Sequence, residues 1–147
     1  MNMNKKQKLF ICFIIGLIFL LIINISKDKN FNELMPLYVN SNSQFMELDS
    51  RKIHFRDEGN GYPIILIHGT GASLHTWDSW TKELVKTHRV IRLDLPAFGL
   101  SGQDPLKRYS SMDYVALLND FVNELNINEQ LKIIGMAAIF QKSKRII

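Results

Sequence analysis

The stretch "IILIHGTGASLHTWDSW", residues 64–80, carries the strongest fold signal in this sequence. It opens with four consecutive apolar residues and lacks the polar alternation of a half-exposed strand. Strands that are buried on both faces of a parallel sheet have this pattern. A glycine-containing loop follows, and then Trp77, Trp80 and Leu84 recur at the spacing of an amphipathic helix. The stretch therefore predicts a buried strand, a loop and a helix, with both tryptophans in the core.

The flanking segments extend this unit on both sides. Residues 45–59, "FMELDSRKIHFRDEG", alternate apolar and polar positions in two arms around a turn, which predicts a hairpin. Residues 89–95 and 131–135 predict two further strands, and residues 109–125 predict a helix with a capping pattern at its start. The order of hairpin, strand, helix, strand, helix and strand predicts an α/β fold with a parallel sheet.

Ligands of open α/β sheets bind beyond the carboxyl ends of the strands, where two of the loops carry recognisable motifs. "IILIHGTGASLHTWDSW" is similar to the His-Gly loop of the α/β-hydrolase family. "VIRLDLPAFGLSG", residues 90–102, resembles the Asp-x-Pro-Gly-x-Gly-x-Ser loop of the same family. The resemblance covers residues 45–135 and implies a partial α/β-hydrolase domain, because both motifs occur in the right order at the right strand ends.

The resemblance implies roles for the first loop. The backbone N–H of Thr70 is the expected oxyanion donor, since acyl transfer needs such donors. Gly69 and Gly71 have no side chain that would obstruct a substrate. His68 is expected to brace the loop through hydrogen bonds and to take no direct part in catalysis.

The second loop is expected to be structural as well. Asp94 braces the turn, and Pro96 and Gly99 shape it. Ala97 stands where the family commonly has glycine. The sequence positions no base beside Ser101, so this serine is not interpreted as a nucleophile.

The third family motif, the nucleophile elbow G-x-S-x-G, is missing. If Gly135 is aligned with its first glycine, Ala137 falls at the serine and Ile139 at the last glycine. Residues 140–147 contain no acid or histidine, although both follow the nucleophile in this fold. We therefore expect no catalytic residue in this chain. The abrupt loss of similarity favours a truncated hydrolase with a divergent basic tail, residues 136–147.

Composition excludes several other classes of protein. The chain has 147 residues and a net charge of +4. Three lysines before residue 9 and three basic residues after residue 140 together carry more positive charge than the whole chain. The part of the chain between them therefore has a slightly negative net charge. A nucleic-acid binder concentrates basic residues on its folded body, which argues against that class. The sequence has one cysteine, Cys12, and no HExxH or GxGxxG, so neither a metal nor another cofactor is expected.

The N-terminal segment predicts a membrane anchor. Residues 9–25, "LFICFIIGLIFLLIINI", could span about 25 Å as a helix and follow three lysines. The positive-inside rule predicts a single-pass signal-anchor embedded in lipid, with residues 1–8 in the cytoplasm and the C-terminal domain across the membrane. A cleaved signal peptide is the main alternative, but signal peptidase needs small residues at its cleavage site and only Ser26 is small in this region. A buried core helix is the third possibility. Residues 26–44 are expected to be a linker.

Four functions remain open at this point. The chain could be an inactive, membrane-anchored relic of a serine hydrolase, or a half-enzyme that another chain completes. It could also be a non-catalytic module that binds an unknown small molecule, or a small membrane protein whose soluble part is incidental. Ester, epoxide, haloalkane and peptide substrates all remain open for a parent hydrolase.

Overall fold

The computed structural model describes residues 4–23, 29–128 and 130–135 of the chain. Its contacts divide the chain into two units, residues 1–30 and residues 31–147. Each unit has its own structure, and each is described below by itself.

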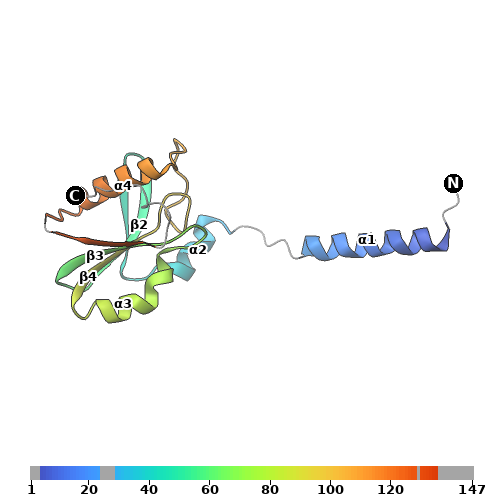
Figure 1. Ribbon diagram of the computed structural model, residues 1–147, viewed down its shortest axis with the longest axis horizontal. Helices are drawn as coiled ribbons and strands as arrows, with labels where there is room; N and C mark the ends of the chain where they lie inside the picture. The colour runs from blue at the N-terminus through green and yellow to red at the C-terminus, as the bar shows by residue number, and fades with distance from the viewer. Residues whose placement is uncertain (1–3, 24–28, 129, 136–147) are drawn as a thin grey trace. The chain divides into compact units, whose positions relative to one another are not determined.

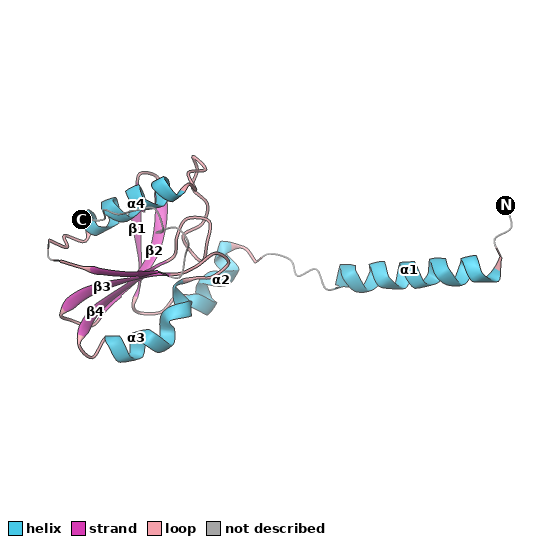
Figure 2. Ribbon diagram, viewed as in Figure 1, coloured by secondary structure: helices cyan, strands magenta, loops and turns pink. Residues whose placement is uncertain are grey.

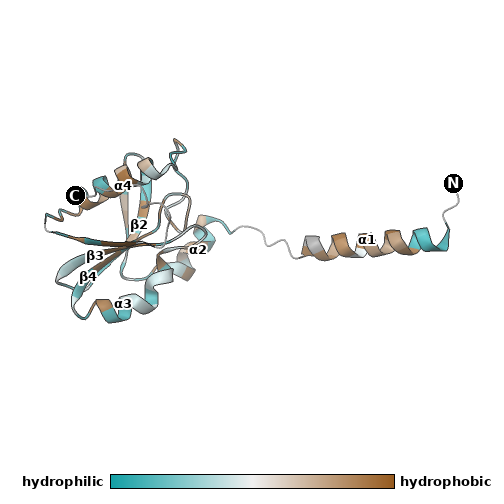
Figure 3. Ribbon diagram, in the orientation of Figure 1, coloured by the Kyte–Doolittle hydropathy of each residue, from teal (hydrophilic) through white to brown (hydrophobic). Residues whose placement is uncertain are grey.

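The N-terminal unit contains one helix, α1 (Lys5–Ile23). Asn4 and Gln7 cap its start reciprocally, because each side-chain oxygen accepts the other residue's backbone N–H at 2.9 Å. The large apolar side chains described between Leu9 and Ile23 are exposed, and Figure 3 shows the hydrophobic colour along most of the helix. None of the helices in the described ranges is both long enough and apolar enough to cross a membrane.

The second unit is built on a five-stranded mixed sheet in the order β1-β2-β4-β3-β5. The antiparallel pairs are β1 with β2 and β2 with β4, whereas β3 runs parallel to both β4 and β5. The prediction of a hairpin that leads into parallel strands is therefore confirmed. The strands are β1 (Ser43–Leu48), β2 (Arg51–Glu58), β3 (Tyr62–Ile67), β4 (His88–Leu93) and β5 (Lys132–Gly135).

Helices cover both faces of this sheet (Figures 1 and 2). Helix α4 (Ser111–Glu124) packs on one face, and the short 3-10 helix η1 (Leu74–Trp77) and α3 (Asp78–Leu84) lie on the other. Strand β3 shows why both faces of the sheet are covered, because its apolar side chains alternate between two buried clusters, one on each face. Ile65 and Ile67 face the α4 side, whereas Ile64 and Leu66 pack with Trp77.

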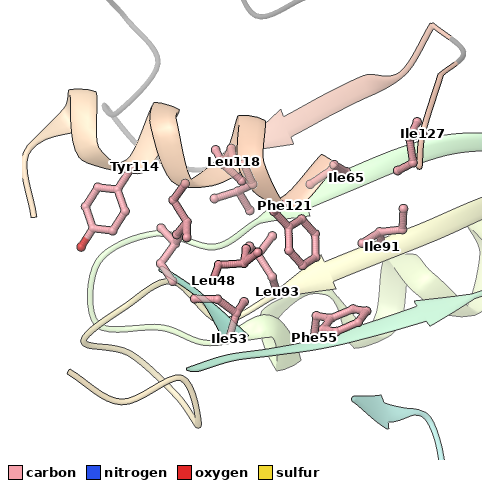
Figure 4. Packing of buried hydrophobic residues seen from close by; sticks show 13 residues of the cluster. Leu48, Ile53, Phe55, Ile65, Ile91, Leu93, Tyr114, Leu118, Phe121 and Ile127 are labelled. Carbon is pink, nitrogen blue, oxygen red and sulfur yellow. The ribbon is translucent and has the colours of Figure 1, made fainter. Parts of the chain in front are cut away.

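The cluster under α4 is the larger of the two (Figure 4). Phe121 of α4 is fully buried and meets Phe55 of β2 edge-on, with 5.3 Å between the ring centroids. The predicted capping pattern is present, since Ser110 and Asp113 form a capping box at the start of α4. Burial of each large apolar side chain stabilises the fold by about 1.5–3 kcal/mol, so α4 holds the hairpin against the parallel strands.

The prediction that both tryptophans lie in the core is wrong for one of them. Trp77 is buried, but Trp80 is 57% exposed, and the two rings are nearly perpendicular with 5.7 Å between their centroids. The i, i+3 spacing of the two tryptophans alone did not specify which of the two rings packs against the sheet, and only Trp77 belongs to the buried cluster on this face.

Part of the expected linker, residues 26–44, is folded. Residues Phe31–Tyr38 form helix α2, and β1 begins at Ser43. Arg56 of β2 fastens the end of α2, because its Nη2 donates to the carbonyl of Tyr38 at 2.8 Å. The sequence suggested no helix here because Pro36 lies inside it and its stabilising contacts come from distant strands.

Buried charge, which the apolar pattern of β4 did not predict, lies on the α3 side of the sheet. Arg92 of β4 is 2% exposed. Its Nη2 donates to Glu58 of β2 at 2.6 Å and its Nη1 to Asp78 of α3 at 2.5 Å. A buried charge is tolerated only when it is paired, so this arginine ties β2, β4 and α3 together.

The turn between β2 and β3 supplies a test of the packing. Gly59 has φ +78°, and a Cβ there would lie 2.4 Å from the carbonyl oxygen of His88. We expect Gly59→Ala to lower the free energy of unfolding by about 3 kcal/mol, because a left-handed backbone cost and a steric clash combine. Gly102→Ala is the control: its φ is +71° but a Cβ would have no neighbour within 4 Å, so about 1 kcal/mol is expected. If urea unfolding showed that both variants lose the same free energy of unfolding, a steric clash at Gly59 would be contradicted.

Candidate functional site

The candidate site lies where the carboxyl ends of three parallel strands meet. Ile67, the last residue of β3, aligns with Leu93 of β4 on one side and with Gly135 of β5 on the other. The loops that start at His68 and Asp94 therefore leave the same edge of the sheet, beside the end of β5. This is the edge at which the sequence places the site.

His68 is fully buried and joins the two loops. Its Nε2 accepts the backbone N–H of Leu95 at 3.0 Å, and its Nδ1 donates to the carbonyl of Gly69 at 2.8 Å. These bonds require a neutral ring with its proton on Nδ1. Phe98 of the second loop meets the ring edge-on at 5.5 Å. Both nitrogens are occupied, so neither is available to a substrate in this structure.

The backbone of the first loop turns tightly after His68. The N–H of Ala72 donates to the carbonyl of Gly69 at 3.3 Å, and Gly71 has φ +72°. Thr70 and Gly71 are exposed, and a Cβ at Gly71 would meet nothing within 4 Å. Within the ranges that the structure describes, no acceptor takes the N–H of Thr70. Its role as oxyanion donor stays a prediction.

Asp94 is the central residue of the site and is 1% exposed. Its Oδ1 accepts the N–H of Leu74 at 2.7 Å, and its Oδ2 accepts the N–H of Leu100 at 2.9 Å. The same Oδ2 lies 2.8 Å from Nδ1 of His54 in β2. One carboxylate thus joins the first loop, the second loop and the hairpin.

The surroundings of Asp94 act on its pKa in opposite directions. Burial raises the pKa, because it disfavours the charged carboxylate. The hydrogen bonds from His54 and from the backbone N–H groups of Leu100 and Leu74 lower the pKa, since they favour the charged form. The net result is a pKa below the usual value for aspartate, so this group is a carboxylate at neutral pH.

The second loop folds closely around this carboxylate. Gly99 has φ +51°, and a Cβ there would lie 2.2 Å from the Asp94 carboxyl group. Ala97 adopts φ +73°, so the alanine stands in a left-handed conformation that usually favours glycine. Pro96 is buried, and its carbonyl accepts a hydrogen bond from the hydroxyl of Tyr114 in α4 at 3.2 Å.

Ser101 is also buried and fully engaged. Its hydroxyl donates to the carbonyl of Asp94 at 2.5 Å and accepts the N–H of His54 at 2.9 Å. This serine therefore links the second loop to β2. No base lies at its oxygen, since both of its partners are backbone groups.

Comparison with known proteins settles the family. A model of the α/β-hydrolase fold matches residues 62–136, just over half of the chain. The chain belongs to the α/β-hydrolase family. The matched region contains both loops and all of β3, β4 and β5.

Several hydrolases are similar to this chain over part of their length. Esterase YbfF from Escherichia coli (strain K12) is 32% identical over 84 residues, which are 57% of the chain and 31% of the esterase. Haloalkane dehalogenase 2 from Mycobacterium bovis is 25% identical over 115 residues, 71% of the chain and 39% of that enzyme. The chain thus spans about a third of the length of the curated relatives it matches.

Solved structures support the same fold. The Cif epoxide hydrolase from Acinetobacter nosocomialis superposes with a TM-score of 0.66 and 23% identity over 82% of the chain and 42% of that enzyme. A bromoperoxidase from Bacillus anthracis superposes with a TM-score of 0.58 and 26% identity over 63% of the chain and 34% of that enzyme. The first likeness shows the hydrolase fold alone, because its identity is below 25%.

The structure brings together most of the hydrolase residues expected from sequence. His68, Asp94 and Ser101 form one buried network, whereas Thr70 and Gly71 lie exposed at the tip of the first loop. Ala137, at the expected nucleophile position, lies outside the described residues. No group of histidine, cysteine or acidic side chains in the described part of the chain could hold a metal ion.

Sequence reasoning missed His54. It lies on β2, forty positions before its partner Asp94, and appeared only as a polar residue between two apolar ones. The ring is fully buried although the pattern predicted an exposed position. A histidine in the second hairpin arm, together with an aspartate directly after a later strand, was the available signal.

The Asp94 network supplies a second test. We expect Asp94→Asn to lower the free energy of unfolding by about 3 kcal/mol at pH 7, because the amide group cannot accept all three hydrogen bonds. The folded carboxylate has a lowered pKa, so its stabilisation is complete above about pH 4 and is lost as the pH falls through the folded value. The gap between wild type and variant should therefore narrow below about pH 4.

The control for this test is Asp120→Asn, which changes a 56% exposed carboxyl group. A change within about 0.5 kcal/mol is expected for it in the same urea titrations. If Asp94→Asn behaved like this surface variant at pH 7, Asp94 would not be the brace of the site.

Proposed function

We propose that this chain forms the N-terminal part of an α/β-fold hydrolase that acts on an ester or a related bond. One observation carries the proposal: Asp94 and His68 hold the two loops together at the carboxyl edge of the sheet. This arrangement leaves the N–H of Thr70 at an exposed loop tip, where an oxyanion donor is needed. The similar proteins named above include an esterase and a dehalogenase, which supports the reaction class but not a substrate.

We also propose that this chain does not by itself catalyse hydrolysis. Ala137 has no oxygen or sulfur with which to attack a carbonyl, and Ile139 replaces the last glycine of the elbow. Ser101 does not substitute for the nucleophile, because its hydroxyl bonds only backbone groups. Removal of triad members leaves only weak catalysis from binding and the oxyanion hole.

The purified chain should therefore fail to turn over p-nitrophenyl acetate, and a fluorophosphonate probe should not label it. The reason is the absence of a serine at the elbow position. A known serine esterase treated in parallel confirms that the probe is reactive. Stoichiometric labelling of the chain would contradict the proposal, and Ser101→Ala would then show whether that serine is the reactive group.

Two alternatives use the same loops. In the first, a separate chain supplies the nucleophile, acid and histidine and completes the enzyme. In the second, the chain is a non-catalytic module whose ligand places a carbonyl or carboxylate oxygen at the open N–H of Thr70. Activity that appears only after a second polypeptide is added would favour the first alternative. Ligand binding without activity would favour the second.

We further propose that residues 9–25 insert into a membrane, with residues 1–8 in the cytoplasm and the hydrolase unit on the other side. The support is the apolar sequence of this segment, the exposure of its large side chains in α1, and the three lysines before it. Its hydrophobic length of about 25 Å is near the lower limit for a spanning helix.

The full chain should remain in the membrane fraction after carbonate extraction at high pH. The matched variant Leu17→Lys/Ile18→Asp places two charges in the apolar segment. It should shift the protein into the supernatant, because each charge costs about 3 kcal/mol at the centre of a membrane helix. Release of the unmodified chain by carbonate would refute the insertion.

A further inference from the structure

The turn between β2 and β3 has the sequence Gly59-Asn60-Gly61, and Asn60 is the only asparagine of the chain that a glycine follows. Asparagine is a chemically labile residue, because the backbone nitrogen of the next residue can attack its side-chain amide. A side chain on that next residue obstructs the attack, and glycine has none. The sequence therefore indicates Asn60 as a reactive position, provided that the fold leaves both reacting groups free.

The turn leaves both groups free. Asn60 and Gly61 are exposed, and they lie outside the hydrogen-bonded strands, since β2 ends at Glu58 and β3 begins at Tyr62. Among the described residues, no hydrogen-bond partner is found for the side-chain amide of Asn60 or for the N–H of Gly61. The amide can consequently rotate towards the nitrogen of Gly61 without the loss of a hydrogen bond within the protein.

The asparagines just before β1 differ from Asn60. Asn40 and Asn42 are exposed as well, but a serine follows each of them. The Oδ1 of Asn40 accepts the backbone N–H of Asn42 at 2.9 Å, and the Nδ2 of Asn42 donates to Glu58 of β2 at 2.9 Å. Each of these side chains is therefore held in place by a hydrogen bond that has to open before the amide can move.

We propose that the fold leaves Asn60 open to spontaneous deamidation and protects the asparagines before β1. The nitrogen of Gly61 gives its proton to water and bonds to Cγ of Asn60, the C–N bond of the amide breaks, and the amide nitrogen leaves as ammonia. The resulting five-membered succinimide takes up one water molecule, which opens one of its two carbonyl–nitrogen bonds. One opening gives aspartate, and the other gives isoaspartate, whose main chain is longer by one carbon. The step needs water alone and neither an oxidant nor a reductant.

The isoaspartate product does not fit this turn. The residues on both sides of Asn60 lie against the backbone at the start of β4. A Cβ at Gly59 would lie 2.4 Å from the carbonyl oxygen of His88, and a Cβ at Gly61 would lie 2.9 Å from that of Thr87. An additional main-chain carbon between the two glycines therefore displaces the turn from this contact. The isoaspartate form should unfold at a lower urea concentration than the unmodified chain.

The test incubates the full chain in detergent micelles at mildly alkaline pH, with and without a denaturing concentration of urea. Peptide mapping by mass spectrometry follows the mass increase that accompanies the conversion of each amide to an acid. Asn60 should convert at nearly the same rate in both samples. Asn42 should convert several-fold more slowly without urea, because its bond to Glu58 must first open.

The matched control is Asn60→Gln, because attack on the longer side chain needs a six-membered ring, which closes far more slowly. The mass increase at residue 60 should disappear in this variant, while the rate at Asn42 stays the same. If urea changed the rates at Asn60 and Asn42 by the same factor, whether both were protected or neither, the proposal would be refuted. If the isoaspartate form, separated by chromatography, unfolded at the same urea concentration as the unmodified chain, the displacement of the turn would be refuted and the deamidation site would stand.

Discussion

The carboxylate of Asp94 is the constraint on which the second unit depends most. Two oxygens accept hydrogen bonds from three segments that are distant in sequence: the hairpin, the loop after β3 and the loop after β4. A buried carboxylate is costly unless its partners are in place, and so are the buried N–H groups that it satisfies. Each of the three segments therefore depends on the carboxylate of Asp94 for the partner of one of its buried polar groups.

The neighbouring groups reinforce this dependence. His68 bonds the second loop through the N–H of Leu95, and Ser101 bonds both Asp94 and His54 through backbone groups. Gly99 approaches the carboxyl group so closely that any side chain would displace it. The loop geometry is consequently the product of one buried network, in which Asp94, Ser101 and His68 each bond a group from another segment.

The parts of the fold that follow local chemistry could be predicted from the sequence. Strand β3 is a continuous apolar run, the hairpin arms alternate, and Ser110 with Asp113 forms a local cap, so each carries its own signal. Both site loops were found because their residues occur as contiguous motifs. The sequence did not indicate which groups bond to Asp94 and His68, because those hydrogen bonds join residues that are far apart in the chain.

The features that the sequence did not predict are those created by tertiary contacts. Helix α2 contains a proline and is held by Arg56, which no local pattern links to it. Arg92 interrupts an apolar strand and is buried only because Glu58 and Asp78 reach it. Trp80 is exposed although it lies three residues after the buried Trp77. For α2 and Arg92 the deciding partner is distant in sequence, outside the window in which periodicity is read.

The same network also separates fold from activity. Asp94, His68 and Ser101 bond protein groups, so their arrangement stabilises the unit whether or not a substrate binds. The arrangement of the two loops is therefore evidence for the hydrolase fold and does not by itself show hydrolysis. Catalysis needs a nucleophile that no part of this network supplies, and the chain places alanine at the expected position. The proposal that the chain is inactive therefore depends on the alignment of residue 137 with the nucleophile, and the buried network of the two loops does not bear on it.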